Sequence, residues 1–364
     1  MKNTFGNSIT LTLFGESHGD AVGAVIDGIA PGLNVNDKNI EKRLSQRRPF
    51  DCASTERVEP DKFSILSGVK NGKTTGAPIC IVITNECAKR EDYGELCGVA
   101  RPGHCDYPAF AKYHGFEDQS GGGHFSGRLT AAIVAAGSIF IDALKEKNIF
   151  IGTHLKKCAG VCDADFDFDN ISKDFETLEN EVFPVLSTDA GDKMRAEILK
   201  AKDEGDSVGG ILETAICGLP AGVGEPWFDS IESTLSHAMF SIPAVKGVEF
   251  GDGFALADKL GSETADEYRI ENGKIVTSTN RMGGIGGGVA NGMPIVFRCA
   301  IKPTPSIEKT LKTVDFVNMK ETEISVKGRH DACIAPRARA VVDALAAFTV
   351  ADLLTMRFGT DFLR

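Results

Sequence analysis

Two long segments of the sequence, residues 126–147 and 336–357, are rich in alanine and mostly apolar through their middles. A helix that is apolar on every side is stable only when other layers of the protein cover every side. We therefore expect both segments to be helices buried between other layers. Each segment follows a polar loop that contains histidine and has an arginine near its start, Arg128 or Arg337. This likeness hints at an internal duplication.

The other predicted elements are shorter. Residues 8–14 alternate polar and apolar side chains like a half-buried strand, and a helix capped by Asn36 or Asp37 should run to Gln46. The turn Asn71-Gly72 predicts a hairpin between two strands. The strands of this hairpin are 62–69 and 77–84; further helices are expected at 190–204 and 227–240, and further strands at 207–217, 274–278 and 294–301.

No Pro/Ser-rich linker or block of charge divides the chain, so we expect a single domain of mixed helices and strands over residues 1–364. The acidic stretch 163–174 is predicted to be an exposed excursion from it. Residues 97–126 lack clear periodicity and gather Arg, His, Asp and Gly. Such composition is typical of a loop that carries a functional site.

The charge balance limits the classes of partner. Lys and Arg number 40 and Asp and Glu 51, a net charge of −11, which gives no general attraction to nucleic acid or to an anionic membrane. An anionic ligand would need a local basic cluster. The apolar runs are broken well short of a membrane span, the N-terminus lacks a signal-peptide core, and the 10 cysteines suit neither a disulfide scaffold nor a zinc site. We expect a cytoplasmic protein with reduced thiols.

Three glycine-containing motifs resemble known signatures only in part. Residues 15–19, GESHG, match the letters of a serine-hydrolase elbow, but only fourteen residues precede them, too few for the strands that come before such a nucleophile. Residues 68–74 have one residue too few between their glycines for a phosphate-binding loop. Residues 283–288 are not a dinucleotide fingerprint, although their backbone could lie against a flat ligand.

Four short groups place a histidine beside arginine or an acid in stretches rich in Gly or Pro. A lone loop histidine is more often structural than catalytic, but the repetition makes a common site the better interpretation. Arginine holds phosphate or carboxylate with a planar fork, and histidine can donate a proton near neutral pH. These types predict a site for a small anionic substrate that gains or loses a proton, and no metal site. The groups are Glu16/His18, Arg101/His104/Asp106, His124/Arg128 and Arg329/His330/Asp331.

At these residues the sequence resembles the chorismate synthase family. The resemblance spans nearly the whole chain, and its motifs occur in the family's order. The matching strings are 15–19 (GESHG), 101–104 (RPGH) with Asp106, 121–123 (GGG) with Arg128 and 130–131 (TA), 244–249 (AVKGVE), 283–285 (GGI) with 287–288 (GG), 302–307 (KPTPSI), and 328–331 (GRHD) with Cys333.

The resemblance implies a carbon–oxygen lyase of the shikimate pathway of aromatic amino acid biosynthesis. The family eliminates phosphate from 5-enolpyruvylshikimate 3-phosphate in a 1,4-anti sense to give chorismate, and it requires reduced FMN without net redox change. NADPH would enter only as a reductant of the flavin. The implied fold is of the α+β class, a β-α-β sandwich with central helices between antiparallel sheets, and the implied assembly is a homotetramer.

Carried over by position, His18 resembles the acid that protonates the departing phosphate, and His104 the one that protonates the reduced flavin. Asp331 matches the acid near flavin N5 that helps to pass on the C6 proton. The substrate-binding positions are Arg47, Arg101 and Arg128. The flavin-binding positions are His124, Phe125, Ser126, Pro243, Ala244, Gly287, Lys302, Pro303, Thr304, Pro305, Ser306 and Arg329, and Arg329 also matches a basic position at the substrate.

The chain departs from the family's pattern in places. Residues 124–129 read HFSGRL where the family usually has Arg-Ser-Ser-Ala-Arg-Glu, and Ala53 stands where a second arginine is expected, with Arg57 as the nearest substitute. Cys105 stands where alanine is common, a change that should leave the geometry alone. Two alternatives therefore stay open: a flavin-binding protein that has lost its chemistry, and a serine hydrolase using Ser17.

Overall fold

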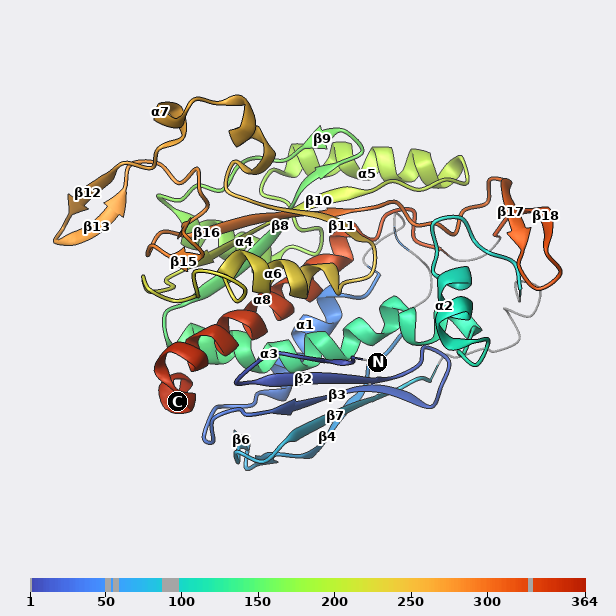
Figure 1. Ribbon diagram of the computed structural model, residues 1–364, viewed down its shortest axis with the longest axis horizontal. Coiled ribbons are helices and arrows are strands. Elements are labelled where there is room, and N and C mark those ends of the chain that lie inside the picture. The colour runs from blue at the N-terminus through green and yellow to red at the C-terminus, as the bar shows by residue number, and fades with distance from the viewer. Residues whose placement is uncertain (1, 50–53, 55–58, 87–97, 327–329) are drawn as a thin grey trace.

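The computed structural model describes residues 2–49, 54, 59–86, 98–326 and 330–364. Within these residues, two five-stranded antiparallel sheets form layers on either side of long helices (Figure 1). The first sheet has the order β1 (Thr4–Phe5), β2 (Thr10–Gly15), β3 (Ala21–Asp27), β7 (Ile79–Thr84) and β4 (Phe63–Ser67). The second has the order β11 (Val245–Phe250), β16 (Ile295–Ile301), β10 (Gly210–Cys217), β8 (Phe150–Cys158) and β9 (Val161–Cys162). The expected α+β sandwich is confirmed.

The two buried helices predicted from the sequence form the middle of the molecule. They are α3 (Thr130–Glu146) and α8 (Ala335–Phe358), and they pack against each other, with Gly137 of α3 lying directly on Ala344 of α8. Helix α3 contacts β3 and β7 of the first sheet, whereas α8 contacts β8 and β10 of the second. One helix, Gly127–Glu146, is long and apolar enough to cross a membrane by length and composition, and 89% of the apolar window in it is buried inside the protein. The burial marks it as a core helix.

Shorter helices surround this pair. They are α1 (Asp37–Gln46), α2 (Asp106–Tyr113), α4 (Ile171–Asn180), α5 (Thr188–Asp203), α6 (Ile231–Phe240) and α7 (Gly261–Thr264). The predicted cap of α1 is confirmed, since the side chain of Asn36 accepts hydrogen bonds from the backbone of Lys38 and Asn39. Helix α1 packs on α3 and ends at Arg47, and this end delivers Arg47 to the candidate site.

Small hairpins complete the fold: β5 (Val69–Lys70) with β6 (Lys73–Thr74), β12 (Tyr268–Glu271) with β13 (Lys274–Thr277), β14 (Ile285–Gly286) with β15 (Val289–Ala290), and β17 (Leu311–Asp315) with β18 (Lys320–Ile324). The turn Asn71-Gly72 lies at the tip of the first, with φ of 53° and 71°, as a tight hairpin turn requires. The hairpin β12–β13 projects from the body of the molecule (Figure 1).

The interpretation of residues 163–174 as an exposed excursion is wrong at its first residue. The side chain of Asp163 is fully buried, where Oδ2 lies 2.8 Å from Nδ1 of His154 in β8. Nε2 of His154 lies 3.1 Å from Oε1 of Glu213 in β10. Although burial opposes it, these hydrogen bonds raise the pKa of His154, which is therefore held as a cation between two carboxylates. The acidic segment is tied to the second sheet by this buried ion pair.

Several elements of the fold, among them β8, β11, α4 and the β17–β18 hairpin, were not predicted from the sequence, and β3 and α2 illustrate the reasons. Strand β3 was not predicted, because its alternation of valine with alanine and glycine (AVGAVID) gives a weak signal. Helix α2 lies within the segment predicted as a loop. Its eight residues include a proline, and the helix packs mainly through Phe110 against Phe316, a contact no local pattern reveals.

Candidate active site

A turn of three consecutive glycines brings two of the predicted catalytic histidines together. Gly121, Gly122 and Gly123 have φ of 60°, 88° and 52°, a conformation that favours glycine. A β-carbon at Gly121 would overlap the ring of His18, and one at Gly122 would lie 3.7 Å from Nε2 of His104. The two imidazoles therefore rest on neighbouring residues of one turn, although 86 positions separate them in the sequence.

The hydrogen bonds around Ser17 orient His18, which is buried in the loop after β2. Oγ of Ser17 lies 3.1 Å from the carbonyl of Ser120 and 2.9 Å from Nδ1 of His18. A hydroxyl has a single proton, so when it donates to the carbonyl it accepts from Nδ1–H. His18 then exchanges its other proton at Nε2. The Ser17 hydroxyl does not donate to the histidine in this arrangement, as a serine nucleophile must.

His104 is held by Arg101 and Asp106, from the loop that leads into α2. Nδ1 of His104 lies 2.7 Å from Oδ1 of Asp106, and Arg101 donates to the same carboxylate from Nε at 2.9 Å and from Nη2 at 2.8 Å. Although burial opposes it, the hydrogen bonds from Arg101 and His104 keep the pKa of Asp106 well below its usual range. Because Nδ1–H donates to the carboxylate, Nε2 is the nitrogen turned toward the glycine turn.

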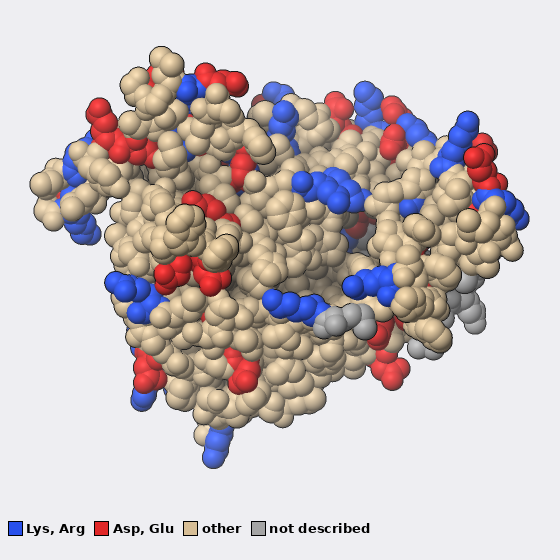
Figure 2. Space-filling view, in the orientation of Figure 1, with Lys and Arg blue, Asp and Glu red and all other residues tan. Residues whose placement is uncertain are grey.

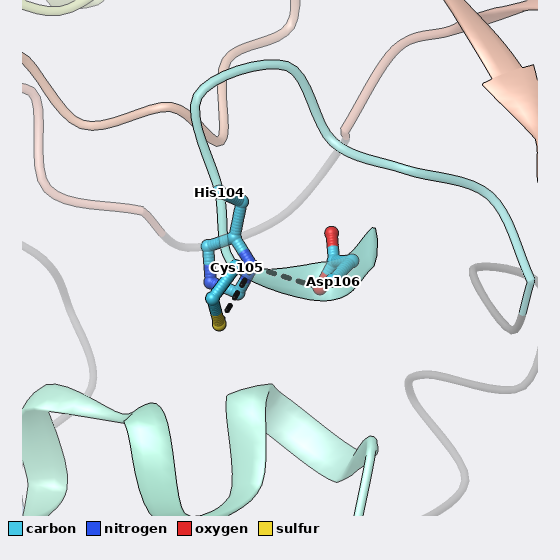
Figure 3. Close-up of side chains that lie close together, drawn as sticks. All are labelled: His104, Cys105 and Asp106. Carbon is cyan, nitrogen blue, oxygen red and sulfur yellow. Dashed lines mark hydrogen bonds and ion pairs between the residues drawn. The ribbon is translucent and has the colours of Figure 1, made fainter. Parts of the chain in front are cut away.

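Cys105 completes a cluster of metal-ligand types with His104 and Asp106 (Figure 3). Their ligand atoms lie within 4.8 Å of one another. Arg101, however, already donates to both oxygens of Asp106, and burial, followed by the negative charge of Asp106, raises the pKa of the Cys105 thiol. A cation here would compete with a guanidinium, so the cluster is better suited to orienting His104 than to holding a metal.

Two of the predicted substrate-binding arginines meet on a buried aspartate, Asp61, that no sequence motif marks. Nη1 of Arg47 lies 3.2 Å from Oδ2 of Asp61, and Nη1 of Arg128 contacts the other oxygen. Arg47 also donates to the hydroxyl of Thr130 at 2.9 Å and to the carbonyl of Gly127 at 3.1 Å. Burial, together with the nearby positive charges, lowers the pKa of Arg47 to about 10. The site concentrates positive charge in a protein of net negative charge.

Asp331, the third predicted catalytic residue, is tied to the same arginine cluster. It precedes α8 and pairs with Nη1 of Arg337 in the first turn of that helix. Nε of Arg337 donates to the backbone carbonyl of Arg47 at 2.8 Å. Arg329, Ala53 and Arg57, for which we made predictions above, lie outside the described residues.

Most of the described flavin-binding positions gather beside these clusters. The backbone N–H of Lys302 donates to the carbonyl of Ala244 at 2.9 Å, which joins 302–306 to 243–244 at the ends of β16 and β11. The hydroxyl of Ser306 lies 3.4 Å from Nη1 of Arg101. Gly287 lies in the β14–β15 turn, and no contact among the described residues joins it to this group.

Residues 124–126 follow the glycine turn directly. Nδ1 of His124 lies 2.7 Å from the carbonyl of Gly15 at the end of β2, and the hydroxyl of Ser126 accepts from the backbone of Arg128 at 3.3 Å. Phe125 is partly exposed and touches Tyr113 edge-on. The segment 120–130 therefore contacts His18, His104 and the arginine cluster in turn.

This face of the molecule is hollowed between α2, α3 and β11, and Lys and Arg side chains lie around the rim (Figure 2). Lys302, at the end of β16, adds positive charge to the predicted flavin-binding segment, and its pKa is lowered by burial and by the nearby charge of Lys246. A small anion would be attracted here despite the net negative charge of the protein.

Comparison with known proteins agrees with these features. The family model described as chorismate synthase matches residues 9–355. Similar curated proteins named chorismate synthase come from Pyrococcus abyssi (46% identical over 352 residues, 97% of each chain) and Archaeoglobus fulgidus (45% over 355 residues, 98% of each chain). A crystal structure of chorismate synthase superimposes with a TM-score of 0.77 at 28% identity, covering 98% of this chain and 95% of the other.

Proposed function

Because the chain belongs to the chorismate synthase family, we propose that His18, His104 and Asp331 carry the proton transfers of that enzyme's reaction. The activity itself is that of a carbon–oxygen lyase, which forms chorismate from 5-enolpyruvylshikimate 3-phosphate in the last step of the shikimate pathway. The observation that carries the assignment of roles is the placement of His18 and His104 on neighbouring glycines of one turn.

His18 is the acid for the leaving phosphate in this proposal. Its Nδ1–H is engaged by Ser17, so proton exchange is confined to Nε2 and the ring cannot rotate without losing that bond. A phosphate that leaves with a proton is a better leaving group than one that leaves fully charged, and a positioned acid typically contributes about 10²- to 10⁴-fold to the rate.

His104 serves the flavin side of the reaction. Asp106 fixes its tautomer, so that Nε2 can face an anionic group resting on the glycine turn. Arg101 secures the carboxylate by two hydrogen bonds and stands next to Ser306 of the predicted flavin-binding segment.

Asp331 helps to carry away the hydrogen lost from C6 of the substrate. Arg337 holds its carboxylate in place, and the link from Arg337 to the backbone of Arg47 keeps this carboxylate at a fixed position relative to the arginine cluster.

Arg47, Arg101 and Arg128 bind the anionic substrate. Burial and the neighbouring charges of Arg337 and Arg128 lower the pKa of Arg47, so the positive charges there repel one another. A bound phosphate or carboxylate would relieve this repulsion and add charge-assisted hydrogen bonds.

The cofactor in this proposal is reduced FMN, with NADPH serving only as a possible reductant. The residues present suit such a group: Oγ1 of Thr304 is a buried oxygen without a hydrogen-bond partner among the described residues, and Lys302 and Lys246 offer positive charge to a phosphate. When bound, the reduced flavin supplies electron density to the allylic system as the C–O bond breaks. The protein binds and orients the two molecules and moves the protons.

We also propose a homotetramer that works in the cytoplasm. The seven cysteines among the described residues are all free thiols, which suits a reducing compartment. In such an assembly Gly287 of one subunit could complete the flavin site of a neighbouring subunit, which would account for its separation from the other flavin-binding positions.

The test is anaerobic turnover of 5-enolpyruvylshikimate 3-phosphate with photoreduced FMN, followed by the absorbance of chorismate. We expect turnover by the wild-type protein and a loss of roughly 10²-fold in the His104→Ala variant with substrate binding retained. Repeating the assay with oxidised FMN and NADPH distinguishes an enzyme that reduces its own flavin from one that depends on an external reductant. FMN binding without chorismate would mean that the changes at residues 124, 125 and 53 have abolished the chemistry.

A further inference from the structure

His330 lies near enough to Arg101 and Asp331 to be influenced by their charges, yet the reaction described above gives it no role. It lies in the loop before α8 and immediately precedes Asp331. Its Nε2 is buried and has no hydrogen-bond partner in the described part of the chain. A buried polar atom without a partner destabilises the fold, and proteins retain few of them. None of the described residues supplies a partner to this nitrogen, so a bound ligand is a candidate for it.

A second orphaned atom lies in the adjoining segment. Oγ1 of Thr304 is likewise buried and without a partner among the described residues. Ser207 and Val208 link the segment that carries Thr304 to the loop that carries His330. The hydroxyl of Ser207 donates to the carbonyl of Thr304 at 2.7 Å, while the backbone of the next residue, Val208, donates to the carbonyl of Ala332 at 2.8 Å.

A second pair of hydrogen bonds joins the segment 302–308 to residues 325 and 326, which follow β18. The backbone N–H of Val326 donates to the carbonyl of Ile307 at 2.9 Å, and the hydroxyl of Ser325 donates to the carbonyl of Glu308 at 2.6 Å. The segment 302–308 is thus bonded to residues 325 and 326, and residues 207 and 208 link it to Ala332, two positions beyond His330. Two unpaired polar atoms in segments linked in this way favour a single ligand that supplies partners to both.

The charges around His330 define the form in which it would act. Burial and the positive charge of Arg101 lower its pKa, against the opposing influence of Asp331 and Glu308. The ring is therefore neutral near pH 7, with one N–H donor and one acceptor nitrogen. A neutral imidazole can hydrogen-bond a polar heteroaromatic ring without adding charge to a site already rich in arginine.

We propose that Nε2 of His330 hydrogen-bonds the isoalloxazine ring of the bound flavin, beside Thr304, which the family resemblance already places at the cofactor. This inference rests on the proposed use of FMN. It assigns the contact to the flavin and not to the substrate because the loop of His330 is linked through Ser207 and Val208 to 302–308, the segment that also carries Thr304. The reduced flavin ring offers both N–H donors and carbonyl acceptors, so either tautomer of a neutral His330 can be satisfied.

The test compares His330→Leu with His330→Gln. Leucine removes the polar atom, whereas glutamine can place an amide group close to the position of Nε2. We expect the dissociation constant of reduced FMN, measured anaerobically by fluorescence quenching, to rise about tenfold in His330→Leu, the size of one buried hydrogen bond, and to stay within about threefold of wild type in His330→Gln. The matched control is His237→Gln, a change of an exposed histidine on α6, which should leave FMN affinity unchanged.

Stability provides the readout that separates a ligand contact from a structural role. Since leucine removes an unpaired buried atom, the melting temperature of His330→Leu without FMN should equal or exceed that of the wild type, while the rise in melting temperature on adding FMN should shrink. A lower melting temperature without FMN, or failure to fold, would show that His330 is structural and would overturn the proposal. Thr304→Val gives the second variant, with the same expected signature.

Other outcomes are equally decisive. Unchanged FMN affinity in His330→Leu would overturn the proposal, and so would a loss confined to the binding of 5-enolpyruvylshikimate 3-phosphate, which would assign the contact to the substrate. If the wild-type protein binds no FMN and forms no chorismate, the proposed function fails first. If wild type turns over and His330→Leu binds FMN normally, only the present inference fails.

Discussion

The contact between His104 and Asp106 permits a quantitative test of how the site is organised. In Asp106→Asn the carboxylate that accepts from Nδ1 at 2.7 Å becomes an amide, which must also face the guanidinium of Arg101. A hydrogen bond to a charged group is worth about 1.5–3 kcal/mol, so the fraction of His104 in the productive tautomer and orientation should fall by roughly 10- to 100-fold. We expect kcat to fall by the same factor.

The double variant provides the sharper result. If Asp106 acts only through His104, adding Asp106→Asn to His104→Ala should cost nothing further, because the group that Asp106 orients is already gone. The measurement is kcat for the four proteins of the cycle, taken anaerobically with photoreduced FMN. Multiplication of the two single effects in the double variant would refute the reasoning. Cys105→Ala, a change in the same loop, serves as the control and should stay within about twofold of wild type.

Two further predictions concern stability and geometry. In His154→Phe the buried cation between two carboxylates is lost, and we expect a destabilisation of about 3 kcal/mol, because each carboxylate keeps other partners, or about 4 °C in melting temperature for a chain of this length. The pKa of His154 is raised in the folded protein, so the charged histidine contributes its full stabilisation below the unfolded pKa of 6.5 and loses it as the pH rises through the folded pKa. The difference in stability between wild type and variant, measured by calorimetry, should therefore become smaller at alkaline pH. A difference that does not change with pH would contradict this. In Gly121→Ala the new methyl group collides with the ring of His18, and kcat should fall by about 10²-fold, whereas Gly127→Ala, where nothing lies within 4 Å, should be silent; equal activity of the two variants would show that the turn does not position His18.

The architecture was largely predictable because its strongest signals are local. The composition of α3 and α8 predicts burial on all sides. Asn36 caps the helix that begins at the next residue, and Asn71-Gly72 forms the turn of its own hairpin, so both signals are local. Elements with weak local signals were missed. Strand β3 is small-residue rich, and α2 is short and held by an aromatic contact with a residue about two hundred positions away. The internal duplication stays a prediction.

Tertiary structure decided which side chains share a site. The motifs around His18, His104 and Asp331 stand out in the sequence because each concentrates unusual residue types within a few positions. Asp61 carries no such signal, yet it joins Arg47 to Arg128, which are 81 positions apart. Likewise, the acidic segment suggested an exposed chain, and only the second sheet shows that Asp163 pairs with a buried histidine.

Residue identity and short-range order are enough to assign the family, to locate the central pair of helices and to name the types of side chain available for the chemistry. Only the folded chain shows that Gly121 and Gly122 support two histidines from separate loops, that Asp61 neutralises buried arginines, and that Nε2 of His330 has no hydrogen-bond partner among the described residues. Hydrogen bonds and burial depend on distances in space, and the sequence of a loop without periodicity does not indicate which distant residues will contact it.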